Sequence, residues 1–232
     1  MTTAGNLRLQ ILAIHGYRQS DMIFRGKLGS LRKSFKNKVD FTFINAPHLV
    51  PLDESQKEST EECSDSAGYG WWFNTSNHTF KATEPSNLAV GFEDSIAVIE
   101  KAFQDHGPFD GIIGFSQGAA FTTILCAMQQ KKLLSARFDF VIIISGFESL
   151  CKPHKVYYEE NINLPCLFIY GETDKIIPTD MSKKLGDLFI EKKLFIHEGG
   201  HYVPGKKNIY SNFIDSCFSK KKISLENKKI EI

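Results

Sequence analysis

One short stretch of the sequence carries the residue types of a nucleophilic site. Residues 114–120 read Gly-Phe-Ser-Gln-Gly-Ala-Ala and place Ser116 between two glycines in a Gly-x-Ser-x-Gly pattern. An apolar run at 109–113 precedes the pattern, and a helix-like segment at 121–130 follows it. A strand-to-helix turn this tight leaves no room for side chains beside the serine and lifts its hydroxyl above a sheet. The pattern therefore predicts Ser116 as a nucleophile.

A serine hydroxyl needs a base and an orienting acid, and candidates for both occur downstream. Asp174 lies in a loop after the predicted strand 164–170, and His201 follows a short predicted strand at 193–196. We predict Asp174 as the acid and His201 as the base, because the chain order Ser, Asp, His is that of α/β-hydrolases. Two alternative acids lie near Asp174 in the chain: Glu172 and Asp180.

The oxyanion that forms when the serine attacks a carbonyl needs two N–H donors. Gln117 directly follows the serine, and its backbone N–H is the first predicted donor. The second is expected in the loop after the first predicted strand, 7–14, where Tyr17 is our candidate and Gly16 the alternative. His15 is predicted to shape this loop rather than to act as a base.

A metal-site pattern overlaps the predicted base. Residues 197–201 read His-Glu-Gly-Gly-His, which matches the His-Glu-x-x-His pattern of zinc proteases. That chemistry needs both histidines on one helical face, whereas here the first follows a predicted strand. Two adjacent glycines also disfavour a helix by about 2 kcal/mol relative to alanine. We therefore predict no metal and no cofactor.

The elements that must position these residues alternate along the chain. Apolar runs predict strands at 7–14, 39–44, 109–113, 138–144, 164–170 and 193–196. Helical patterns predict a first helix that is capped by Ser20 or Asp21 and runs through 25–36. Further helices are predicted at 88–106, 121–130, 179–190 and 206–218, followed by a lysine-rich, solvated tail at 219–232.

Continuous apolar strands that alternate with helices predict a parallel sheet covered on both faces. Right-handed crossovers then give a doubly wound α/β domain, whose site lies at the carboxyl ends of the strands. We therefore predict one α/β-hydrolase domain over residues 1–232, with a mainly parallel sheet of about six strands and helices on both faces.

Residues 47–87 lack a regular pattern and are predicted as a long, lid-like insertion. The insertion is acidic at 53–65 and aromatic at 69–80. Its Trp-Trp-Phe run at 71–73 has two interpretations: a satellite core under the loop, or a wall or lid over a substrate pocket. Trp71, Trp72 and Phe147, which follows another predicted strand, are accordingly the candidate substrate-binding residues.

The composition excludes several classes of protein. The 232 residues are 42% hydrophobic and 24% charged with a formal net charge of +1, which gives no sign of a nucleic-acid or anionic-membrane partner. No apolar run approaches the ~20 residues of a membrane span, and the first residues lack the apolar region of a secretory signal. Five cysteines without a Cys-x-x-Cys pair indicate reduced thiols in a cytosolic or nuclear compartment.

With these motifs, the chain resembles the FSH family of serine hydrolases of fungi and animals over nearly its whole length. The most specific segment joins Gly-Pro-Phe-Asp-Gly at 107–111 to the Ser116 motif. The resemblance implies a small α/β-hydrolase that acts on carboxylic esters, some members being thioesterases, with Ser116, Asp174 and His201 as its catalytic triad. The other segments that carry the resemblance are 12–20, 24–25, 31–33, 144–147, the Asp174 loop and 200–204.

These observations together predict a serine esterase that forms an acyl-enzyme intermediate on a small-molecule ester with an apolar chain. Two alternatives stay open: a thioesterase that acts on acyl thioesters, and a non-catalytic binding module that has kept the fold. The complete set of Ser116, Asp174 and His201 argues against the binding module. The oligomeric state has no signature in the sequence.

Overall fold

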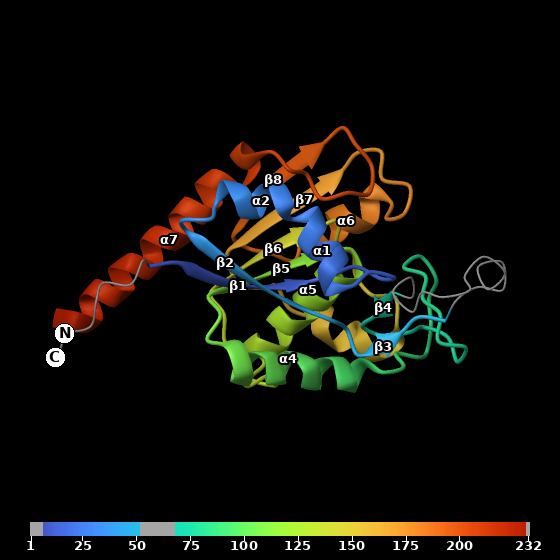
Figure 1. Ribbon diagram of the computed structural model, residues 1–232. Helices are drawn as coiled ribbons and strands as arrows, with labels where there is room; N and C mark the ends of the chain where they lie inside the picture. Colours follow the sequence, from blue (N-terminus) through green and yellow to red (C-terminus); the bar gives the residue numbers. More distant parts are fainter. Residues whose placement is uncertain (1–6, 52–67, 231–232) are drawn as a thin grey trace, which may run out of the picture.

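A six-stranded parallel sheet forms the centre of the computed structural model, which describes residues 7–51 and 68–230 (Figure 1). The predicted parallel sheet is thereby confirmed. Across the sheet the strand order is β2, β1, β5, β6, β7, β8. In chain order the strands are β1 (Leu9–Ile14), β2 (Val39–Ile44), β5 (Gly111–Phe115), β6 (Phe140–Ile144), β7 (Cys166–Gly171) and β8 (Lys192–His197).

The strand order changes direction between β1 and β5. From β1 the chain passes to β2 on one side, and it then returns to place β5 on the other side of β1. Such a switch point opens a crevice at the carboxyl ends of the two strands, where ligands bind in doubly wound sheets. The loop after β1 and the serine after β5 both lie at this crevice.

Helices cover both faces of the sheet, because successive side chains of each strand point to opposite faces. In β1, Leu12 and Ile14 join the core under one face, whereas Ile11 and Ala13 join the core under the other. The first face is covered by α4 (Phe92–His106), α5 (Gln117–Gln130) and α6 (Thr179–Gly186), and the second by α1 (Asp21–Lys27), α2 (Gly29–Ser34) and α7 (Lys207–Ile230) (Figure 1).

The helix ends differ from the prediction at several places. The single helix predicted through 25–36 is two short helices that meet at Leu28. The predicted cap at Ser20 is confirmed, because Ser20 Oγ accepts the Ile23 N–H at 3.2 Å at the start of α1. Helix α5 starts directly after the serine, four residues before its predicted start. Helix α6 ends at Gly186 instead of at residue 190.

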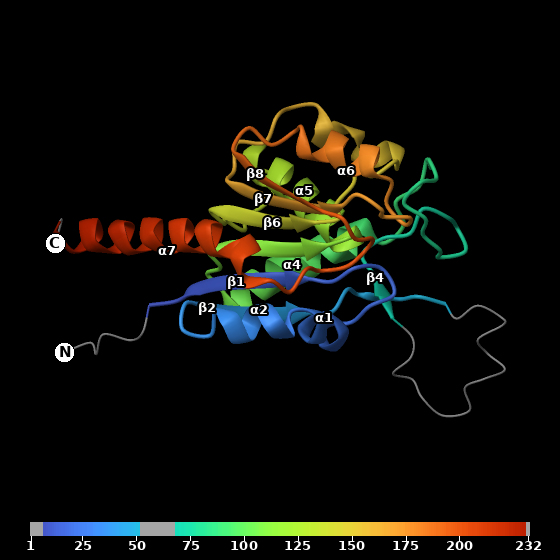
Figure 2. The ribbon, with the colours of Figure 1, turned by 90° about the horizontal axis from the view of Figure 1, so that it is seen from above.

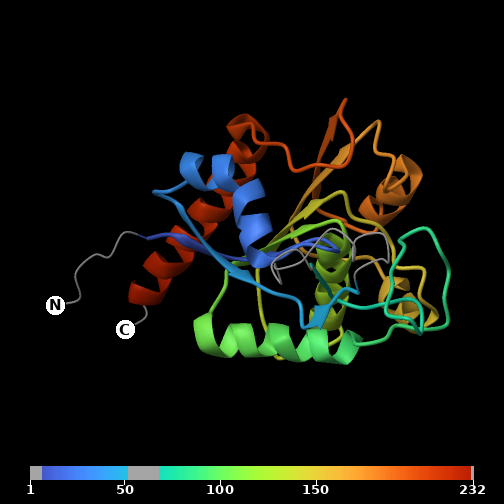
Figure 3. The same cartoon turned by 45° about the vertical axis from the view of Figure 1, so that its right-hand side comes forward.

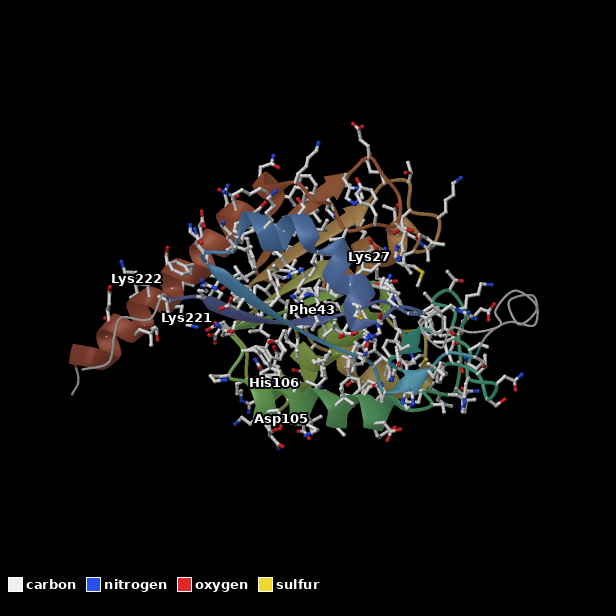
Figure 4. The ribbon with its side chains drawn as sticks, viewed as in Figure 1. Lys27, Phe43, Asp105, His106, Lys221 and Lys222 are labelled. Atoms are coloured by element: carbon white, nitrogen blue, oxygen red, sulfur yellow. The ribbon has the colours of Figure 1, made fainter. Side chains whose placement is uncertain are left out.

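The largest difference concerns α7, which continues to Ile230 where a tail was predicted from residue 219. Lysine is a good helix former, so the lysine-rich stretch carries no stop signal. Lys221 also anchors the helix: its Nζ lies 2.7 Å from Asp110 Oδ2 and 2.9 Å from Arg8 O (Figure 4). The last part of α7 extends beyond the sheet (Figures 1 and 2).

The predicted insertion at 47–87 is only partly described, and its acidic part at 53–65, with Cys63, lies outside the described residues. Its described ends form a small antiparallel pair, β3 (His48–Leu49) and β4 (Tyr69–Gly70). The four described cysteines are buried free thiols: Cys126, Cys151, Cys166 and Cys217. None of the helices in the described part of the chain has the length and apolar character needed to cross a membrane.

Candidate active site

The turn between β5 and α5 holds Ser116 in a conformation that few residues adopt. Its φ is 55°, in the left-handed region that side chains disfavour. The flanking glycines make the turn possible. A Cβ on Gly114 would lie 2.5 Å from the Gly118 carbonyl oxygen, and a Cβ on Gly118 would lie 2.3 Å from the Ile14 carbonyl oxygen. The glycines therefore let the turn pack against the end of β1.

Two residues from distant loops meet Ser116 at this turn. His201 Nε2 lies 2.9 Å from Ser116 Oγ, and His201 Nδ1 lies 2.7 Å from Asp174 Oδ2. The Phe115 ring packs against the imidazole, with 4.8 Å between ring centroids. The structure thus brings together the serine, histidine and aspartate that the sequence singled out.

The loop after β7 fixes the aspartate. Asp174 Oδ1 accepts the backbone N–H groups of Ile176 at 2.8 Å and Ile177 at 2.9 Å, which leaves Oδ2 for the histidine. The Asp174 side chain is only 2% exposed, whereas the alternative acids are exposed: Glu172 and Asp180. Among the described residues, neither alternative makes a hydrogen bond to His201.

The pattern of hydrogen bonds determines where the protons lie. A carboxylate only accepts, so His201 must donate its Nδ1–H to Asp174. The Nε2 of the neutral imidazole is then an acceptor, and the Ser116 hydroxyl donates to it. Such a histidine can take up the serine proton while the adjacent carboxylate stabilises the imidazolium.

The predicted oxyanion loop lies beside the serine. Tyr17 lines the same cavity as Ser116, and the alternative donor, the Gly16 N–H, points to Gln19 Oε1 at 3.4 Å. His15 accepts the Ala46 N–H on Nε2 at 3.0 Å, so its Nδ1–H donates to the Gly16 carbonyl at 2.8 Å. Burial lowers the pKa of His15 to about 4, which keeps the imidazole neutral. Both ring nitrogens of His15 thus make hydrogen bonds that fix the loop after β1.

The Gln117 side chain has a role that the sequence did not reveal. Its Oε1 accepts the Trp71 N–H at 2.9 Å, and its Nε2 donates to the Trp72 carbonyl at 2.8 Å. The Trp71 indole in turn donates to the His15 carbonyl at 2.8 Å. The first residue of α5 is therefore tied through Trp71 to the loop that carries Tyr17.

The three candidate substrate-binding residues lie behind the cavity instead of lining it. Trp71 and Trp72 are fully buried in the core, and Phe147 is 1% exposed. The Trp-Trp pair thus belongs to the main hydrophobic core of one sheet face. Phe147 packs against the cavity residue Phe80, with 6.1 Å between the two ring centroids.

The cavity that contains Ser116 and His201 has a volume of about 370 Å³. Its apolar wall comes from Phe80, Ile176 and Ile177, so the loop that positions Asp174 also shapes the cavity. No periodic pattern marked Phe80 in the sequence, because it lies in the irregular insertion. The remaining lining residues are polar or small: Tyr17, Gln19, Lys81, Ala82, Thr83 and Lys175.

The His-Glu-x-x-His pattern falls at the end of β8, not on a helix. His197 Nδ1 accepts the Gly199 N–H at 3.2 Å. His201 Nδ1 carries the proton donated to Asp174, and the lone pair of Nε2 accepts the Ser116 hydroxyl, so His201 has no lone pair left for a metal. No group of three or more metal-ligating side chains occurs within the described residues.

Comparison with known proteins identifies the family. The family model described as serine hydrolase (FSH1) matches residues 5–213. The chain belongs to the serine hydrolase (FSH1) family. Its family relatives include the esterase OVCA2 of Danio rerio, 40% identical over 218 residues that cover 89% of this chain and 96% of the relative. The esterase CG5412 of Drosophila melanogaster is 38% identical over 224 residues, which cover 97% of this chain and 78% of the relative. This FSH1-family chain is therefore a hydrolase.

Solved structures share the fold of this FSH1-family member. The esterase PE8 superposes with a TM-score of 0.59 at 22% identity and covers 94% of both chains. The acyl-protein thioesterase 2 of Zea mays has a TM-score of 0.60 at 15% identity, with 94% of this chain and 97% of the neighbour covered. At this level of identity the likeness establishes the α/β-hydrolase fold alone.

Proposed function

We propose that Ser116, His201 and Asp174 form the catalytic triad of a serine esterase. The observation that carries the proposal is the chain of two hydrogen bonds, 2.9 Å and 2.7 Å long, that joins the hydroxyl to the carboxylate through the imidazole. The left-handed backbone of Ser116 presents the hydroxyl to the cavity, where the acyl carbonyl of an ester can reach it.

The reaction proceeds in two halves. His201 takes the Ser116 proton as Oγ attacks the acyl carbonyl, and then gives that proton to the leaving alcohol. Water, deprotonated by the same imidazole, attacks the acyl-enzyme and releases the carboxylic acid. The backbone N–H groups of Tyr17 and Gln117 are the proposed oxyanion donors. In serine hydrolases, loss of one such donor typically lowers turnover by roughly 10²–10³.

The substrate is a small-molecule ester with an apolar acyl chain. Phe80, Ile176 and Ile177 offer an apolar surface next to the serine, and the volume of about 370 Å³ falls within the range of small-molecule sites. Ile176→Ala should therefore weaken turnover of a long-chain p-nitrophenyl ester more than that of the acetate. Matched acyl thioesters test the thioesterase alternative: a higher kcat/KM on the thioester would replace the esterase assignment.

A fluorophosphonate probe tests the triad directly, because it labels only an activated serine. Wild type should be labelled, Ser116→Ala should not, and Ser211→Ala on α7 serves as the matched control that keeps labelling. Unlabelled wild type would favour the non-catalytic binding module instead.

We also infer a cytosolic location, with the nucleus as the alternative, because the four described cysteines are buried free thiols. Cell fractionation followed by immunodetection tests this location, and recovery in the secreted fraction would contradict it.

A further inference from the structure

A second, larger cavity lies beside the one that contains Ser116. Its volume is about 600 Å³, and four chain segments line it: the stretch before α4, the loop after β6, the 3₁₀ helix η2 (Lys152–Tyr158) and α6. Figure 3 shows η2, α6 and the stretch before α4 at the same end of the molecule. The proposed reaction makes no use of this cavity.

One short segment separates the two cavities. Residues up to Thr83 line the cavity of Ser116, and residues from Pro85 line the second cavity. The Cα atoms of Thr83 and Pro85 lie at most about 7 Å apart, because two residues of fully extended chain reach no further. The linings of the two cavities therefore come within two residues of each other along this segment.

The separating segment is held in place by a buried side chain. Asn74 is 6% exposed, and its Nδ2 donates to the carbonyls of Lys81 at 2.9 Å and Glu84 at 3.1 Å. Ser86 Oγ donates to the Asn74 carbonyl at 2.7 Å. The wall between the cavities is thus a fixed part of the fold.

The second cavity carries an excess of positive charge. Three of its lining residues are lysines and one is a glutamate. Lys184 forms an ion pair with Glu148 at 2.7 Å, whereas Lys152 and Lys155 have no ion-pair partner in the part of the chain that the structure describes. Two positive charges are therefore left uncompensated at the cavity.

Two of the residues that line the same cavity carry neutral hydrogen-bond donors. The Tyr158 hydroxyl accepts the Ser149 N–H at 3.0 Å, and its own proton has no acceptor within the described ranges. Burial raises the pKa of Tyr158, so the hydroxyl keeps this proton at neutral pH. The Asn87 amide, also at the cavity, makes no hydrogen bond to another described residue. Two cations, one hydroxyl and one amide match a doubly charged phosphate group.

We propose that the second cavity binds a phosphate carried by the leaving alcohol or thiol, so that the preferred substrate is an acyl ester or thioester with a phosphorylated leaving group. This inference rests on the proposed function. The acyl chain occupies the cavity of Ser116, and the leaving group crosses the segment between Thr83 and Pro85. Attack by Ser116 breaks the bond between the acyl carbon and the leaving oxygen or sulfur, which takes its proton from His201. The phosphate itself makes and breaks no bond.

Acyl esters of straight-chain diols test the proposal. One series ends in a free hydroxyl, the other in a phosphate monoester, and the spacer length is varied in both. At one spacer length, wild type should show at least about tenfold higher kcat/KM for the phosphorylated ester, mainly through a lower KM. The double variant Lys152→Gln/Lys155→Gln should reduce this ratio to near one. Lys183→Gln, an exposed neighbour of Lys184 that does not line the cavity, should retain the full ratio.

The possible failures point to different steps. Equal kcat/KM for both series at every spacer length, with Ser116-dependent hydrolysis intact, overturns the phosphate site but leaves the proposed esterase standing. Absence of Ser116-dependent hydrolysis in both series removes the proposed function and the inference together. A ratio that survives the double variant but falls in Lys175→Gln places the phosphate in the cavity of Ser116 and overturns the second site. Circular dichroism of the double variant confirms that it is folded.

Discussion

At the scale of single residues, the aspartate decides which form of the histidine is present. Asp174 receives two backbone N–H groups on one oxygen and the imidazole N–H on the other, so its position is fixed from three sides. This arrangement lets the histidine accept the serine proton without first rotating. The predicted alternatives, Glu172 and Asp180, have no comparable anchoring to His201 in the described structure.

Asp174→Asn should keep the fold but lower kcat by roughly 10³–10⁴, because an amide can stabilise the wrong imidazole tautomer and cannot neutralise the imidazolium. Steady-state kinetics on a p-nitrophenyl ester measures the effect, and KM should change little. Glu172→Gln, two residues earlier, is the matched control and should retain near wild-type turnover. A low kcat in Glu172→Gln with near wild-type turnover in Asp174→Asn would instead identify Glu172 as the acid.

The sequence predicted those site residues that lie in loops after strands, but not the contacts made by residues in irregular segments. Ser116, Asp174 and His201 each lie in the loop or turn that follows a predicted strand, so the topology of a parallel sheet brings them together. The Gln117 side chain contacts Trp71, a residue 46 positions away in an irregular segment, and no local pattern reports such a contact. For the same reason the sequence left two interpretations of Trp71, a core residue or a cavity wall, whereas the structure places Trp71 in the core and Phe80 at the cavity.

Gln117→Leu should lower the free energy of unfolding by about 1–3 kcal/mol, because it leaves the Trp71 N–H and the Trp72 carbonyl buried without a partner. It should also reduce kcat, although the backbone N–H of residue 117 is still present. Urea unfolding and ester kinetics measure the two effects. Gln104→Leu on the exposed side of α4 is the control, and equal stability of both variants would exclude the bridging role.

At the scale of elements, polar contacts join helices to the ends of strands. Asp110, just before β5, accepts the Gln10 N–H at 2.6 Å and forms an ion pair with Lys221 of α7 at 2.7 Å. The aspartate of the Gly-Pro-Phe-Asp-Gly segment thus joins two strands and a helix. A regular apolar pattern predicted the strands well, but it gives no sign of this charge contact between α7 and the residue before β5.

Asp110→Asn should therefore destabilise the fold by about 1–3 kcal/mol, and Lys221→Met by a smaller amount. The double variant should be less destabilised than the sum of the two single variants, because the two charges interact directly. Urea unfolding of all four proteins completes this double-mutant cycle. Strict additivity would show that the ion pair contributes nothing to stability.

At the scale of the whole molecule, two buried neutral histidines make stability depend on pH. Burial lowers the pKa of both His15 and His154 from 6.5 to about 4. Between these values the unfolded chain binds protons that the folded chain does not, so stability is lost as the pH falls from 6.5 towards 4. Each histidine contributes up to about 3 kcal/mol to this loss.

His154→Gln should flatten the pH dependence by removing one of the two groups. Its free energy of unfolding should fall less between pH 7 and pH 4.5 than that of wild type. His106→Gln, at the exposed end of α4, is the matched control and should show the wild-type slope (Figure 4). A slope unchanged in His154→Gln would mean that this ring is not the group that titrates.

The contact between Lys221 and the start of β1 joins a segment that is synthesised early to one that is synthesised late. The carbonyl of Arg8 and the ammonium of Lys221 are 213 positions apart in the chain. During translation the first strand emerges early, yet one of its anchoring charges arrives only after all five other sheet strands have been made. The contact between α7 and the start of β1 can therefore form only after the last helix has been synthesised.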